Sequence, residues 1–170
     1  LAAPHPVDAV ELMQAAGVLA RLLPGAEAAG LAALEAVPDG TAAPGAVCPR
    51  TPEDISVMKK DWQLRLAALG ADDAAGALRL SRAEARVQDE LRSTLPLAEA
   101  AYRLGEDRAV QLALLLASRG ENLRADWCEQ IGFAAAQVLP ISAADLAGRL
   151  TGPALGRGLK SAEAAWIGSG

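Results

Sequence analysis

Apolar residues recur every three or four positions along most of this chain, which is the spacing of one face of an α-helix. The clearest case begins at Glu53, where the apolar face comprises Ile55, Met58, Trp62, Leu66 and Leu69. We expect this face, and Trp62 with it, to enter the core. Lys59, Lys60 and Arg65 fall on other sides of the same predicted helix and are expected to lie away from that face.

Local end signals divide much of the remaining chain into further helices. Glycine tolerates the left-handed conformation that ends a helix, and glycines close the helices predicted at residues 7–16 and 97–104. Ser81 and Glu84 have capping-box spacing, in which each side chain satisfies a free amide, so a helix is expected from Ser81 to about residue 93. Ser142 and Asp145 form a weaker version of this signal. A short helix is therefore expected to run from there to residue 149.

The remaining helices are predicted from periodicity and from proline. Residues 27–36, 107–118 and 122–138 have helical patterns, and Gly152-Pro153 begins a last helix because proline suits the first helical position. Leucines cover most of the circumference of the helix at 107–118. We expect that helix to be central and buried.

The composition agrees with an all-helical fold. The 170 residues include 40 alanines but only 13 valines and isoleucines together, and 3% are aromatic. This balance favours helix formers over strand formers and makes an all-β sandwich or barrel untenable. The sequence therefore predicts an all-α fold, an irregular bundle of about eight or nine mostly short helices.

Charge and residue usage exclude several kinds of function. The formal net charge is −5, which counts against a broad nucleic-acid surface. No apolar run approaches the roughly 18 to 20 residues of a membrane span, and no secretory signal precedes the first helix. Cys48 and Cys128 match neither a zinc spacing nor a disulfide framework, so we expect two idle thiols in a reducing compartment.

Catalytic motifs are absent from the sequence. His5 is the single histidine and has no cysteine or carboxylate at metal-ligand spacing. The adjacent acids at 72–73 and 89–90 diverge on a helix and are expected to be solvated. There is no phosphate-binding loop and no Gly-x-Ser-x-Gly motif. We expect no self-contained active site and no metal or cofactor in this chain.

Two clusters of basic residues are candidates for binding phosphate. Arg157 and Lys160 stand three residues apart near the Gly152 turn, where free amides and the positive end of the helix dipole would reinforce them. The second cluster surrounds the start of the helix that follows Ser81 and consists of Arg79, Arg82 and Arg86. The alternative is that both clusters are solvated faces paired with Glu84, Asp89, Glu90 and Glu163.

Several segments resemble bacterial tRNA nucleotidyltransferases, the CCA-adding enzymes and their poly(A) polymerase relatives. Leu-Arg-Leu-Ser-Arg-Ala-Glu at 78–84 is similar to a segment of their helical body, and residues 9–19 are similar to the helix where the body follows the neck. The tail is closer to the alphaproteobacterial type. It contains Pro-Ile-Ser-Ala-Ala-Asp-Leu at 140–146, Gly-Pro-Ala-Leu-Gly-Arg-Gly-Leu-Lys at 152–160 and Ala-Ala-Trp-Ile at 164–167.

The resemblance implies a division of the chain. Residues 1–36 correspond to the end of the neck and the start of the body, 53–139 to the helical body and 140–170 to the helical tail. Residues 37–52 contain four prolines and two glycines and match the family poorly, so we expect a linker or insertion there. The chain begins with Leu and ends Gly-Ser-Gly, and we expect it to be a fragment.

The resemblance also implies a function. Such enzymes add CMP and AMP from CTP and ATP to the tRNA 3′ end, using magnesium in a β-sheet head, while body and tail grip the acceptor and elbow region of the tRNA. The head motifs Gly-Gly-x-Val-Arg-Asp and Asp-x-Asp are absent here, so this cytoplasmic fragment is expected to be inactive alone. If the family's RNA contacts are carried over to the matching positions, Gly152, Arg157 and Lys160 contact the RNA backbone. Arg79, Arg82 and Arg86 are expected to do the same.

Two alternatives stay open from the sequence. The chain could be a helical interaction or assembly module that packs on another protein and has no RNA role. Within the family, the sequence does not distinguish complete CCA addition from partial addition or poly(A) synthesis, because specificity lies in the missing head.

Overall fold

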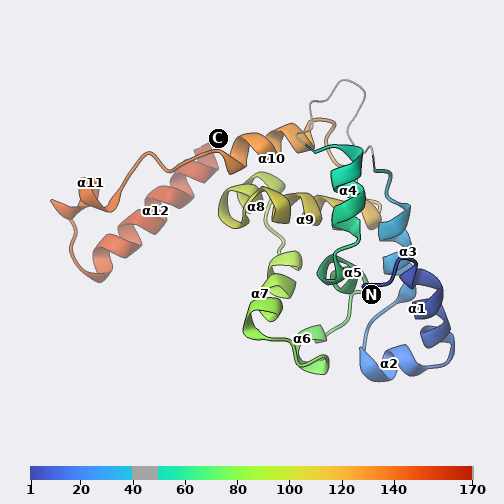
Figure 1. Ribbon diagram of the computed structural model, residues 1–170. Helices are drawn as coiled ribbons and strands as arrows, with labels where there is room; N and C mark the ends of the chain where they lie inside the picture. Colours follow the sequence, from blue (N-terminus) through green and yellow to red (C-terminus); the bar gives the residue numbers. More distant parts are fainter. Residues whose placement is uncertain (40–49, 170) are drawn as a thin grey trace. The chain divides into compact units, whose positions relative to one another are not determined.

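The computed structural model describes residues 1–39 and 50–169, and within these ranges every regular element is a helix (Figure 1). There are twelve helices, nine of them with seven or more residues, which confirms the all-α prediction. The helices are α1 (Pro6–Ala15), α2 (Val18–Leu22), α3 (Ala28–Ala36), α4 (Pro52–Lys59), α5 (Trp62–Ala68), α6 (Ala74–Ala77), α7 (Arg82–Leu91), α8 (Leu97–Leu104), α9 (Glu106–Ser118), α10 (Trp127–Ala135), α11 (Ala143–Ala147) and α12 (Pro153–Ser169).

The chain forms two compact units. The first comprises Leu1–Ala135 and contains α1 to α10, and the second comprises Ala136–Gly170 and contains α11 and α12. The sequence divided the chain slightly later, at residue 140. Of the linker expected at 37–52, residues 40–49 lie outside the described residues.

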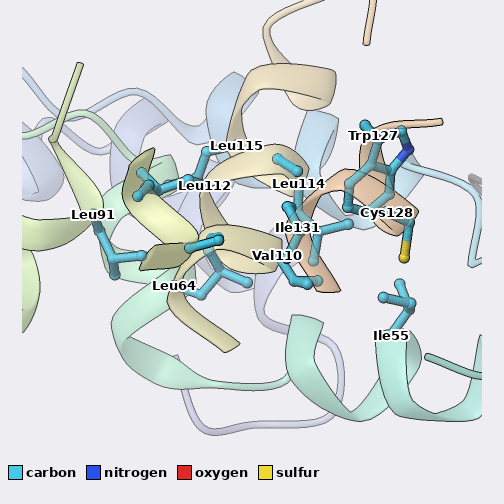
Figure 2. Close-up of a cluster of buried hydrophobic side chains, with 14 of the residues drawn as sticks. Ile55, Leu64, Leu91, Val110, Leu112, Leu114, Leu115, Trp127, Cys128 and Ile131 are labelled. Atoms are coloured by element: carbon cyan, nitrogen blue, oxygen red, sulfur yellow. The ribbon is translucent and has the colours of Figure 1, made fainter. Parts of the chain in front are cut away.

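Helix α9 is the centre of the first unit. All seven residues from 109 to 115 are buried, which confirms the prediction of a central helix. The leucine side chains of α9 meet Leu64 of α5, Leu91 of α7 and Ile131 of α10 (Figure 2). Each leucine removed from water contributes roughly 1.5 to 3 kcal/mol, so this cluster is the main source of stability in the unit.

The apolar face that begins at Glu53 belongs to two helices instead of one. The first, α4, ends at Lys59, and Asp61 caps α5 by accepting a hydrogen bond from the Gln63 amide at 2.9 Å. Ile55, Leu66 and Leu69 of the predicted face are buried, whereas Trp62 is only half-buried. Helix α5 is buried on several sides, and the expectation that Lys59 and Arg65 lie away from the buried face is wrong because they are 7% and 1% exposed.

A second cluster of buried apolar side chains joins α1, α2, α3 and α5. Helices α3 and α5 approach so closely at Gly30 that a Cβ there would lie 2.0 Å from the Ala68 carbonyl oxygen. Beside it, the Glu27 amide donates to the Leu69 carbonyl at 2.8 Å. Gln14 of α1 accepts the Ala28 amide at 2.6 Å and so satisfies the start of α3.

The second unit is a small helical hairpin. Asp145 accepts hydrogen bonds from the amide and hydroxyl of Ser142 at 2.8 and 2.7 Å, which confirms the capping signal predicted at the start of α11. Leu150, which follows α11, packs on α12 at Gly158, where an added Cβ would lie 2.5 Å from its Cδ1. A bulkier residue there would have to displace the Leu150 side chain.

Candidate nucleic-acid interface

Helix α12 carries the first predicted cluster on its solvent face. Arg157 and Lys160 are three residues apart, so their side chains are neighbours on one side of the helix. Leu155 and Leu159 are half-buried on the other side. Both cations are exposed, and neither forms an ion pair or hydrogen bond with any residue in the described part of the chain.

The second unit has an excess of positive charge although the whole chain is acidic. Residues 136–170 contain three basic and two acidic residues, a net charge of +1 against −5 for the chain. Of the two acids, Asp145 is engaged: hydrogen bonds from the Ser142 amide and hydroxyl keep the pKa of its carboxyl below the ordinary value. Arg149, the third cation, is exposed as well.

The backbone at the start of α12 contributes less than the sequence predicted. Gly152 has a left-handed φ of 53° and turns the chain into the helix, as expected of a glycine. The amides of Ala154 and Leu155 are not free, because they donate to the carbonyls of Thr151 and Gly152 at 3.2 and 3.1 Å. Tight turns of this kind satisfy the first amides internally. Binding at this face therefore depends on the side chains.

The two glycines of α12 have different surroundings. Gly158 allows the close approach of Leu150, which is the packing role considered from the sequence. Gly156 has nothing within 4 Å of an added Cβ. Only the first of them is required by the hairpin.

The second predicted cluster is split by the structure. Arg86 pairs with Glu90 at 2.9 Å, and Glu90 also holds Arg108 of α9 at 3.2 Å. Arg79 lies on the turn between α6 and α7, and Arg82 is the first residue of α7; both are exposed, with no partner among residues 1–39 and 50–169. Arg86 therefore pairs within its own helix, while Glu90 joins α7 to α9 through Arg108, and only Arg79 and Arg82 of this cluster have no partner among the described residues.

Arg79 ends α6 in a left-handed conformation with φ 51°. Its amide donates to the Gly76 carbonyl at 3.2 Å, and the Leu80 amide donates to the Ala75 carbonyl at 2.9 Å. These two bonds define a Schellman motif, in which glycine is favoured at the position that Arg79 occupies. A side chain at this φ is strained.

We expect Arg79→Gly to stabilise the protein. Glycine adopts the left-handed conformation without steric cost, and its greater freedom in the unfolded chain offsets only part of the gain. The net increase in the free energy of unfolding should be about 0.5 to 1 kcal/mol. Urea denaturation of the two proteins measures it, and a decrease on substitution would contradict the strain assigned to this position.

The structure also buries polar residues that the sequence gave no reason to select. Gln111 of α9 donates to the Asp61 carboxylate at 2.9 Å, and Gln88 of α7 donates to the Gln63 carbonyl at 3.0 Å. Lys59 is 7% exposed, and its Nζ donates to the Val37 carbonyl at 2.8 Å. These groups hydrogen-bond between segments of the fold, so we interpret them as structural.

The remaining sequence candidates do not assemble into a site. His5 is exposed, and Asp73 caps α6 by accepting a hydrogen bond from the Gly76 amide at 2.8 Å. Glu90 forms ion pairs with Arg86 and Arg108. Across the described ranges, the acidic, histidine and cysteine side chains form no group of three that could hold a metal ion. Nor does any helix in those ranges combine the length and apolar character needed to cross a membrane.

Cys128 contradicts the expectation of idle thiols. It is buried beside Trp127 at the start of α10 (Figure 2). It is also disulfide-bonded. The other cysteine of the chain, Cys48, lies outside the described residues. Disulfides persist mainly in oxidising compartments, so this bond counts against the reducing compartment expected from the sequence.

Alkylation provides the test of this bond. We expect iodoacetamide to leave Cys128 unmodified in the unfolded, unreduced protein and to modify it after reduction, because only a thiolate is nucleophilic. The protein is unfolded before alkylation, so burial of Cys128 cannot explain a lack of modification. Peptide mass spectrometry reads the result, and modification before reduction would show that Cys128 is a free thiol.

Comparisons with known proteins give no relative. No protein family, curated protein or solved structure matches the chain. The resemblance to tRNA nucleotidyltransferases therefore rests on the sequence motifs quoted above, and the interface rests on the geometry of α12 and of the turn before α7.

Proposed function

We propose that this chain is an RNA-positioning helical fragment related to the tRNA nucleotidyltransferases, with the solvent face of α12 as its main contact to the RNA backbone. The observation that carries the proposal is the pair Arg157 and Lys160, exposed and unpaired within the described residues. The sequence resemblance at 140–146 and 152–160 supports it.

The chemistry of the face suits a phosphate backbone. Lysine and arginine bind phosphate oxygens by charge-assisted hydrogen bonds and carry no information about sequence. An enzyme that extends every tRNA needs contacts of this kind. In this proposal CTP, ATP and magnesium bind a separate catalytic head.

Charge reversal on α12 tests the proposal. We expect the double variant Arg157→Glu, Lys160→Glu to weaken binding of a tRNA transcript that lacks its 3′ CCA by about tenfold at low salt. The slope of log affinity against log salt should become shallower by about 1.5, because two phosphate contacts are lost. Fluorescence anisotropy at several salt concentrations measures both quantities.

A matched control separates local contact from overall charge. Arg21→Glu, Arg119→Glu makes the same change in net charge at two exposed arginines of the first unit. This control should bind nearly as tightly as the wild type. Equal losses in the two double variants would reject the α12 face as the site, and an unbound wild type at low salt would reject the RNA function.

A second candidate function is favoured by one observation. Leu12 of α1 and Leu22 of α2 are 73% and 51% exposed, which leaves two large apolar side chains open to a protein partner. A helical assembly module would use such residues to pack on protein. A sizing run by light scattering distinguishes the two functions: a discrete self-assembled species without tRNA binding would favour assembly.

A further inference from the structure

The turn between α6 and α7 places an arginine where the chain otherwise uses glycine. In the described ranges, seven residues have a positive φ, and six of them are glycines: Gly17, Gly25, Gly70, Gly105, Gly120 and Gly152. Arg79 is the exception, at φ 51°. The Schellman hydrogen bonds of this turn do not need its side chain. The fold by itself would therefore favour glycine at this position.

Nothing in the described structure uses the Arg79 side chain. It is exposed, as is Arg82 at the first position of α7, and neither forms an ion pair or hydrogen bond in residues 1–39 or 50–169. The acidic residues that lie nearest in sequence to these two arginines already accept hydrogen bonds from other groups. Asp73 accepts the Gly76 amide, and Glu84 accepts the Ser81 amide at 2.8 Å. Hydrogen bonds from the Ser81 hydroxyl and amide lower the pKa of the Glu84 carboxyl, so it remains an anion engaged in capping.

The local chemistry points to a phosphate ligand. A guanidinium group presents a planar set of donors that matches a phosphate group by two parallel hydrogen bonds. Residues 74–91 contain no aromatic side chain, so the turn and its two flanking helices themselves supply no platform on which an unpaired base could stack. Backbone phosphates of a structured RNA suit such a surface better than single-stranded bases.

We propose that Arg79, with Arg82 beside it, is a second contact to the RNA phosphate backbone, and that arginine is kept in a strained position for this contact. The inference rests on the proposed function, since it assigns the same RNA a contact on the first unit. Strained residues persist where a function requires them. The substitution that relieves the strain should therefore remove the contact.

Three variants test whether relief of the strain at Arg79 removes the RNA contact. Arg79→Gly should raise the melting temperature by a few degrees, weaken tRNA binding several-fold and make the salt slope shallower by about one. Arg79→Lys keeps the charge at the same strained φ, so it should keep the wild-type salt slope and melting temperature. Arg119→Gln removes an exposed, unpaired cation elsewhere in the first unit and should change the affinity little.

The outcomes separate this inference from the proposed function. If the wild type binds tRNA in a salt-dependent manner and Arg79→Gly binds with unchanged affinity and slope, the second contact is overturned and the α12 site stands. An equal loss in Arg79→Gly and Arg119→Gln overturns it as well, because the effect is then one of overall charge. If the wild type does not bind tRNA, the proposed function and this inference fall together.

Discussion

Gly30→Ala is expected to lower the free energy of unfolding by about 3 kcal/mol, the upper end for an added methyl group in a packed site. The new Cβ would lie 2.0 Å from the Ala68 carbonyl oxygen, well inside contact distance. That oxygen belongs to the α5 backbone, so no side-chain rotation relieves the clash. Helices α3 and α5 would have to separate, which also strains the hydrogen bond from the Glu27 amide to the Leu69 carbonyl.

Urea denaturation followed by circular dichroism measures this loss. Gly156→Ala provides the matched control, because an alanine Cβ there meets nothing within 4 Å. In that helix the same substitution should leave stability unchanged or raise it by up to about 1 kcal/mol, since alanine is the better helix former. A Gly30→Ala protein as stable as the wild type would mean that α3 and α5 do not cross at this distance.

Arg65→Met should cost about 3 kcal/mol, because it removes one partner from a set of buried polar groups. The Arg65 side chain is 1% exposed, and its Nε donates to the Glu35 carboxylate and the Lys59 carbonyl, each at 2.9 Å. Its Nη1 donates to the carbonyls of Leu1 and Ala3 at 2.7 and 2.9 Å. One guanidinium therefore joins the N-terminal segment, the end of α3 and the break between α4 and α5.

Two further variants make the result specific. Arg65→Lys keeps the charge but lacks the fork of donors, so it should lose most of the same stability. Arg119→Met, at an exposed position, should change stability by less than about 0.5 kcal/mol. Faster proteolysis of the first residues in Arg65→Met would report release of the N-terminal segment. Full stability in Arg65→Met would show that these contacts are not important to the fold.

The sequence alone determined the fold class and several helix ends, although the helix predicted at 122–138 spans only Trp127–Ala135. Helix α8 spans the predicted residues 97–104, and the capping boxes at Ser81 and Ser142 form as their spacing indicated. These signals are local: a cap or a helix-ending glycine acts within a few residues, so it can be read without the fold.

Only the tertiary structure decided where the buried charges lie and which cations remain unpaired. Arg65 is buried because it binds Glu35 of α3 and the carbonyls of Leu1 and Ala3, and Gly30 is required by a helix that lies far along the chain. The bond between Arg86 and Glu90 lies within one helix and was open from the spacing, but the bond from Glu90 to Arg108 of α9 depends on the fold. The contacts of Arg65, Gly30 and Arg108 bring together groups from distant parts of the sequence. Local spacing therefore contains no record of them.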